Sequence, residues 1–118
     1  MINISTNFHP FRLKLSRREP VEFTVVLKNK DSETKMITYE MALAKDISLD
    51  KSGLKYGDIK TISELKPGEE KKLQYDVYAK QFARIGEIPI RIKITEHYNS
   101  FKYIEKEYTK DVHLTLEE

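Results

Sequence analysis

Histidines are the side chains in this sequence best suited to holding a metal ion or moving a proton, and they occur at His9, His97 and His113. A zinc or catalytic site needs several His, Cys, Asp or Glu side chains that converge. The chain has no cysteine. The alternation of neighbouring residues puts His113 on an outward strand face and His97 near a hairpin tip. We therefore expect surface histidines and no metal or cofactor.

Carboxylates in an irregular region form the second candidate site. Asp46, Asp50 and Asp58 could bind calcium through oxygen ligands. Their spacing lacks the alternate-position carboxylates and the central glycine of an EF-hand loop. We expect ordinary loop carboxylates here.

A third candidate is the pair Glu105 and Glu107, which share one strand face. Paired carboxylates hydrolyse glycosides when they meet across a cleft, and 118 residues leave little room for one. Cross-strand pairing with Arg91 and Lys93 is the expected arrangement. There is also no nucleophile elbow and no glycine-rich phosphate loop. The sequence therefore predicts a protein that is not an enzyme.

Basic residues gather near the N-terminus, at Arg12, Lys14, Arg17 and Arg18. With the neighbouring phenylalanines Phe8 and Phe11, this cluster could bind nucleic acid or another polyanion. The alternative is a solvated strand edge whose charge discourages strand addition. Twenty-one basic and 19 acidic residues leave a net charge of only +2, which gives little reason to expect strong nonspecific binding to nucleic acid.

Tyrosine is abundant, with seven copies. The candidate partner-contact residues, at or near predicted loops, are Tyr56, Tyr98, Phe101 and Tyr103. Exposed tyrosines offer contact area together with a polar group; the alternative is that they cap the ends of a small core. We expect contacts from the hairpin at 98–103 and from the irregular segment 46–58, because loops on a rigid scaffold carry most recognition.

The elements that position these residues are strands. Pro67-Gly68 fits a type II turn, and residues 73–79 then alternate between apolar and polar. The alternation resumes after Gly86, with isoleucine at 88, 90, 92 and 94. Such a period of two indicates strands with one buried face. Pro89 conflicts with an internal strand, so we expect regular pairing to begin at Ile90.

The same pattern extends along the chain. We predict an all-β, immunoglobulin-like sandwich of two antiparallel sheets and about seven to nine strands. It forms a single domain over residues 1–118, with residues 1–10 as an extra strand or arm, and one helical turn at 79–83. Lys106 and Lys110 interrupt the last strand, which indicates that its first half projects beyond the core or that a bulge switches its faces.

Three segments resemble a known group of modules: VEFTVVLKNKDSET (21–34), LKPGEEKKLQYDV (65–77) and IGEIPIRIKIT (85–95). In order and spacing they resemble immunoglobulin-like modules of the CARDB and S-layer-associated type, and they are similar to the C-terminal sandwich domains of transglutaminases. The resemblance covers about residues 21–116. It implies an adhesion, spacer or protein-contact domain without catalysis of its own.

The leading interpretation is thus a non-enzymatic module for assembly or adhesion that binds a protein partner or itself, through an exposed edge strand or end loops. Polyanion binding at residues 12–18 is the alternative. No signal peptide begins the sequence and no apolar run is long enough to span a membrane. As written the chain is expected in the cytoplasm, unless it is a domain of a longer exported protein. The Lys- and Glu-rich composition without cysteine or tryptophan is compatible with a thermophilic source. The archaeal and bacterial modules that the chain resembles imply an archaeal-like or bacterial origin.

Overall fold

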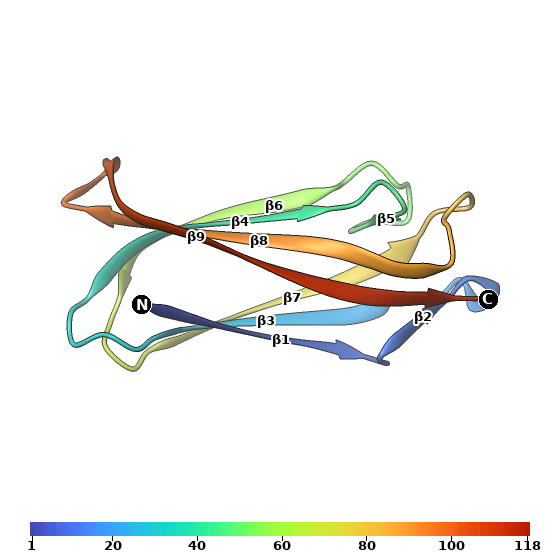
Figure 1. The fold of residues 1–118 in the computed structure, drawn as a ribbon, viewed down its shortest axis with the longest axis horizontal. Coiled ribbons are helices and arrows are strands. Elements are labelled where there is room, and N and C mark those ends of the chain that lie inside the picture. The colour runs from blue at the N-terminus through green and yellow to red at the C-terminus, as the bar shows by residue number, and fades with distance from the viewer.

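The computed structural model describes all residues, 1–118, and consists of strands with one short 3₁₀ helix. In chain order the elements are β1 (Ile2–His9), β2 (Arg12–Lys14), the 3₁₀ helix η1 (Leu15–Arg17), β3 (Val21–Asn29), β4 (Lys35–Leu43), β5 (Ile47–Ser48), β6 (Gly57–Leu65), β7 (Glu70–Ala79), β8 (Gly86–Tyr98) and β9 (Ser100–Glu117). Figure 1 shows them stacked as two layers along one long axis.

The two layers are a four-stranded sheet in the order β1-β3-β7-β5 and a five-stranded sheet in the order β2-β9-β8-β4-β6. The series β9-β8-β4-β6 corresponds to strands G-F-C-C′ of an immunoglobulin sandwich, and β1-β3-β7 to A-B-E. The predicted all-β, two-sheet fold is confirmed. One ladder departs from the expectation, because β2 runs parallel to β9.

The core lies between the sheets and follows the predicted alternation. Ile90, Ile92 and Ile94 are fully buried, as are Phe23 and Tyr39 from the strands that face or flank them. Each such side chain contributes about 1.5–3 kcal/mol through removal of apolar surface from water. Because every second residue of β3, β4 and β8 meets the opposite sheet, the period of two specifies which face is buried.

Some predictions of local structure are confirmed and others are wrong. The Pro67-Gly68 turn is present, with Glu69 N–H donating to Lys66 O at 2.9 Å and Gly68 at φ +77°. The predicted N-terminal strand forms and pairs with β3 over its whole length. The helical turn expected at 79–83 is wrong: Ala83 N–H donates to Lys80 O in a single tight turn. The 3₁₀ helix at Leu15–Arg17 lies instead where the sequence indicated strand and loop.

Pro89 lies inside β8 and pairs with His113 of β9, so the expectation that pairing begins at Ile90 is wrong on that side. On the β4 side it is correct, because that ladder starts at Ile90 opposite Leu43. Leu43, an odd-numbered residue of β4, donates its N–H to Tyr56 O on the β6 side. Because successive residues of a central strand bond alternately to its two neighbours, the even-numbered residues of β4 bond to β8. The N–H that Pro89 lacks would therefore point beyond the end of β4.

The β8–β9 ribbon is longer than the sandwich that it belongs to. Its far end extends past the other strands at the left of Figure 1, and the molecule measures 47 × 24 × 19 Å. Register shifts at Glu96/His97 and His97/Tyr98 mark where the ribbon leaves the body. The projection that the lysines of the last strand indicated is thus present. The bulge comes before Lys106, and the register from Lys106 to Leu116 is unbroken, so the alternative of a switch of faces at the lysines is wrong. Helices that could cross a membrane are not found.

Candidate functional site

The projecting end of the β8–β9 ribbon, residues 98–107, is here called the arm. Its turn is at Asn99, whose φ of +62° suits asparagine. Apart from the half-buried Ser100, every residue of the arm is exposed. The predicted hairpin tip at 98–100 is therefore present, and it stands clear of the opposite sheet.

Four large apolar side chains are exposed within the ten residues of the arm. Tyr98 is 62% exposed, Tyr103 63% and Ile104 62%, with Phe101 also exposed. Four such side chains on ten residues form a candidate contact surface, because exposed aromatic side chains bury large areas when a partner covers them. The structure therefore brings together three of the predicted contact residues and adds Ile104.

His97 anchors the root of the arm. It is only 9% exposed, so the expectation of a surface histidine is wrong. Its Nε2 lies 2.7 Å from Thr38 Oγ1, its Nδ1 lies 3.2 Å from Tyr103 O, and the Phe101 ring meets it edge-on. These contacts tie both strands of the arm to β4. His9 and His113 are exposed, as predicted.

A buried ion pair lies at the same root. Lys35 Nζ is 3.5 Å from Glu96 Oε1 and 3.7 Å from Asp31 Oδ2, and Glu96 is 2% exposed. Burial by itself lowers the pKa of Lys35, but attraction to Glu96, Glu105 and Asp31 raises the pKa above its ordinary value. The cationic form is therefore held firmly, while Glu96 Oε2 has no hydrogen-bond partner.

Tyr108, on β9 beside this ion pair, joins the ribbon to the N-terminus. Its hydroxyl accepts from Ile2 N–H at 2.8 Å and donates to Ile2 O at 3.3 Å. Burial raises the pKa of the Tyr108 phenol. Sequence reasoning missed Lys35 and Glu96; the available signal was that Glu96 continues the inward series of isoleucines in β8.

Tyr56 does not join the other predicted contact residues. It precedes β6 at the opposite end of the sandwich, near β5 (Figure 1). There the Lys80 ammonium lies 3.9 Å from the centre of its ring. The predicted contact set thus divides into the arm, which carries Tyr98, Phe101 and Tyr103, and a separate end, where Tyr56 and Phe82 both contact the Lys80 ammonium.

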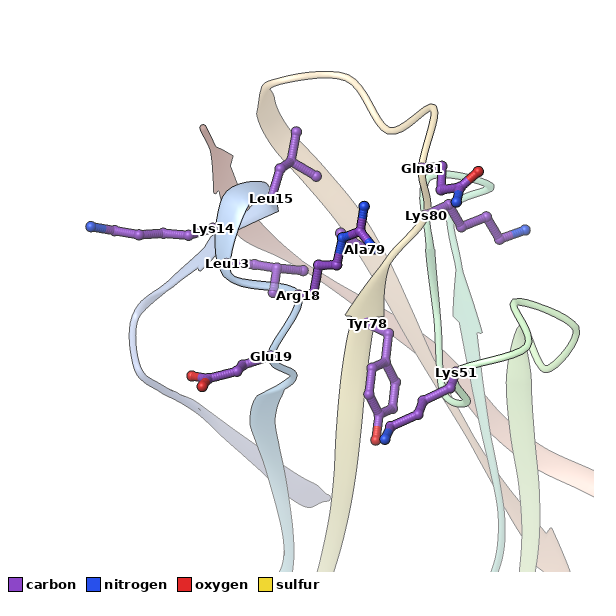
Figure 2. Close-up of a pocket in the computed structure, with 10 residues that line it drawn as sticks. All are labelled: Leu13, Lys14, Leu15, Arg18, Glu19, Lys51, Tyr78, Ala79, Lys80 and Gln81. Atoms are coloured by element: carbon purple, nitrogen blue, oxygen red, sulfur yellow. The ribbon is translucent and has the colours of Figure 1, made fainter.

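The basic cluster borders an open cavity of about 540 Å³ at that opposite end. Its lining is Leu13, Lys14, Leu15, Arg18, Glu19, Lys51, Tyr78, Ala79, Lys80 and Gln81. Figure 2 shows Lys14 and Lys80 pointing away from it on opposite sides, while Lys51 lies along Tyr78. Arg12 and Lys14 pair with Glu117 at 3.3 and 3.8 Å. The cationic groups therefore do not converge.

The candidate carboxylates also remain apart. Asp46 accepts from Arg84 N–H at 2.9 Å, which holds the pKa of Asp46 below its ordinary value. Asp50 accepts within its own loop, and Asp58 accepts from the Tyr75 hydroxyl at 2.8 Å. No three metal-ligating side chains gather anywhere in the structure.

Cross-strand ion pairs explain part of the predicted carboxylate pattern. Lys93 Nζ lies 3.2 Å from Glu107 Oε1, as expected. Arg91 pairs with Asp111 at 2.9 Å and not with Glu105. Glu105 and Glu107 are both exposed and lie on the same strand, β9, whereas the carboxylates of a glycosidase face each other across a cleft.

Fold and surface together define an all-β, two-sheet sandwich with a projecting aromatic hairpin. No family model and no curated protein matches the sequence. Among solved structures, the chain is similar to a β-glucosidase from Listeria innocua in complex with isofagomine: 13% identity, TM-score 0.46, covering 100% of this chain and 16% of that one. It is also similar to Spo0M, the sporulation control protein from Bacillus subtilis: 13% identity, TM-score 0.47, covering 99% of this chain and 49% of that one. The chain thus spans less than half of either protein, and scores at this level carry no inference about activity or partner.

Proposed function

We propose that the protein is a non-enzymatic interaction module that binds a protein partner through the arm, for assembly or adhesion. The observation that carries the proposal is the gathering of Tyr98, Phe101, Tyr103 and Ile104 on a ribbon end that has no opposite sheet. Apolar side chains inside the sandwich stabilise the fold because they are removed from water. The exposed side chains of the arm are not removed from water and contribute much less to the stability of the fold. Contact with a partner is the remaining use of this apolar surface.

The root of the arm supports the same proposal. His97 and Thr38 join the arm to β4, and the Lys35–Glu96 pair lies directly beneath. A contact surface held in place before binding loses less conformational entropy when the partner arrives. The resemblance to immunoglobulin-like modules of the CARDB type agrees with an adhesion or assembly role and stays part of the proposal.

The experiment is a quantitative pull-down from cells of the source organism, with the double variant Tyr98→Ala/Tyr103→Ala compared with the wild type. We expect the variant to lose most of any captured partner while its unfolding curve stays unchanged. Phe82→Ala, which removes an equally exposed aromatic side chain from the other end, is the matched control and should capture the partner normally. Equal capture by all three proteins would contradict the proposal.

Polyanion binding at Arg12, Lys14, Arg17 and Arg18 is the second candidate. Lys14 and Arg18 line the cavity in Figure 2 together with Lys51 and Lys80, although their charged groups do not converge in it. Neutralised phosphates make affinity fall steeply with salt. Binding of a duplex or single-stranded oligonucleotide that weakens sharply with added salt, and that is lost in Arg17→Ala/Arg18→Ala, would favour this candidate over the arm. Capture of a partner that is insensitive to salt and depends on Tyr98 and Tyr103 would favour the arm instead.

A further inference from the structure

The two sheets end in edge strands that are treated differently. The edge of β1 is partly closed, because the Tyr108 hydroxyl bonds to Ile2 N–H and O, and Lys110 Nζ donates to Ile4 O at 2.8 Å. The first part of the β6 edge has no such cover: β6 pairs only with β4, and side chains bond to its backbone only at Leu65, where Asn29 Nδ2 donates to the carbonyl. Unpaired edges of this kind accept another strand.

The ladder with β4 tells which β6 residues present their backbone outward. Leu43 N–H donates to Tyr56 O at 2.8 Å, and the same register pairs Met41 with Asp58 and Tyr39 with Lys60. In an antiparallel ladder every second residue bonds to its neighbour. The even-numbered residues of β6 therefore bond to β4, and the N–H and C=O groups of Gly57, Ile59 and Thr61 point away from the sheet.

The open edge has a defined length. A register shift between Lys35 and Ile37 places one extra residue in β6 after Ile62. Such a bulge interrupts a ladder and ends regular pairing. Only residues 57–62 can therefore receive a strand, which restricts the possible registers to those centred near the middle of this segment.

We propose that two copies of the protein pair antiparallel through β6, with Ile59 on the two-fold axis. In this register Ile59 faces Ile59 of the second copy, and Asp58 faces Lys60 of the second copy on both sides of the axis. Opposite charges across a ladder stabilise it and like charges destabilise it. Moving the axis to Lys60 would set two lysines against each other. Moving it to Thr61 would leave Asp58 without a partner, because the residue opposite it, Glu64, lies beyond the bulge.

The exposure of Ile59 fits this register. Ile59 is 66% exposed, the largest apolar side chain along β6 on the outer face, and it pairs with Glu40 rather than with an apolar neighbour. Contact with its own copy would shield both side chains. Three outward-bonding residues per copy give about six backbone hydrogen bonds, a small contact, so the dimer forms at high protein concentration. The proposal is independent of the arm, because the arm belongs to β8 and β9 and β6 pairs with neither of them.

Single cysteines test the register directly, because the chain has none of its own. Ile59→Cys brings two thiols together on the axis, within the Cα separation of about 4.4–6.8 Å that a disulfide needs. Thr61→Cys, on the same exposed face, leaves its two copies about 14 Å apart. Under mild oxidation we expect Ile59→Cys to form the disulfide dimer about tenfold faster or more. Equal rates for the two variants would overturn the proposal.

Charge exchange provides the second test, read by sedimentation velocity. Lys60→Glu should shift the wild-type monomer–dimer equilibrium toward monomer, and Asp58→Lys should do the same. Mixing the two variants should restore dimer, because each carboxylate then faces a lysine again. Circular dichroism checks that both variants fold. A wild-type protein that stays monomeric at every concentration, or a mixture that does not recover, would overturn the proposal in favour of a strand from another protein or of an unused edge.

Discussion

The two halves of the β8–β9 ribbon have the same local structure and opposite surroundings. From Ile88 to Ile94 on β8, every second side chain is buried against the other sheet; in the arm, side chains of both parities are exposed. Four isoleucines occupy the first half and the aromatic residues occupy the second. A ribbon of two strands can therefore continue beyond the core, but its apolar side chains then have no partner within the molecule.

The boundary between the halves is polar, not apolar. His97 bonds to Thr38, and Lys35 pairs with the buried Glu96, at the positions where the isoleucine series ends. Polar contacts specify direction and register better than apolar ones do, because an unmatched buried polar group is costly. The boundary thus fixes the angle at which the arm leaves the body.

The largest expected difference comes from matched isoleucine substitutions in the two halves. Ile92→Ala removes a fully buried side chain and should lower the free energy of unfolding by about 4 kcal/mol, through lost burial and the cavity left behind. Ile104→Ala, in the arm, should change it by less than about 0.5 kcal/mol. Urea denaturation measures both, and a similar loss in the two variants would mean that the arm packs against the body.

Next in size is the boundary ion pair. Lys35→Met leaves Glu96 buried without its counter-charge and should lower the free energy of unfolding by about 3 kcal/mol. The double variant Lys35→Met/Glu96→Met, which removes both charges, should recover much of that loss. A double variant less stable than Lys35→Met would show that the pair stabilises the fold by more than its desolvation costs.

The same pair predicts a dependence on high pH. Because the pKa of Lys35 is raised above 10.5 in the folded state, its contribution to stability is complete below the unfolded value and is lost as pH rises through the folded value. Wild-type stability should therefore fall above about pH 10.5 more steeply than that of the Lys35→Met/Glu96→Met variant. Parallel thermal melts at rising pH check this, and identical slopes would contradict it.

A smaller effect is expected at His97. Thr38→Val keeps the shape of the side chain and removes the hydroxyl that bonds to His97 Nε2, at a cost of about 1–2 kcal/mol. The informative measurement is hydrogen exchange, since amides of the arm should exchange faster while those of Ile90 and Ile92 change less. Uniform acceleration across both halves would mean that the boundary does not hold the arm separately.

The smallest effect is expected for the outer ion pairs. Hydrogen bonding to Arg91 lowers the pKa of Asp111 below 3.8, so this contribution is present at neutral pH and is lost as pH falls through the folded value. Asp111→Asn should cause only a slight loss at pH 7, because the pair is exposed to water and screened by salt. Glu107→Gln in the arm should lower the free energy of unfolding, measured by chemical denaturation, by about the same small amount. A clearly larger loss in either variant would contradict the prediction that both outer ion pairs contribute little.

The sequence by itself determined the strands and their faces. Period-two alternation over 73–79 and 88–94 specified both the elements and the buried side, because the side-chain period of a strand is fixed by backbone geometry. Pro67-Gly68 determined its turn for the same local reason. The turn signal at 98–100 placed Tyr98 at a hairpin tip and Tyr103 near it, but whether they are exposed or cap the core was left open.

Only the tertiary structure decided the rest. Strands distant in sequence decide whether His97 is buried and which carboxylate pairs with Arg91. They also decide where the opposite sheet ends. Tyr56 and the arm lie at opposite ends because two stacked sheets run the length of the molecule between them. The open edge of β6 likewise exists only because the strand order ends there, and local alternation contains no information about strand order.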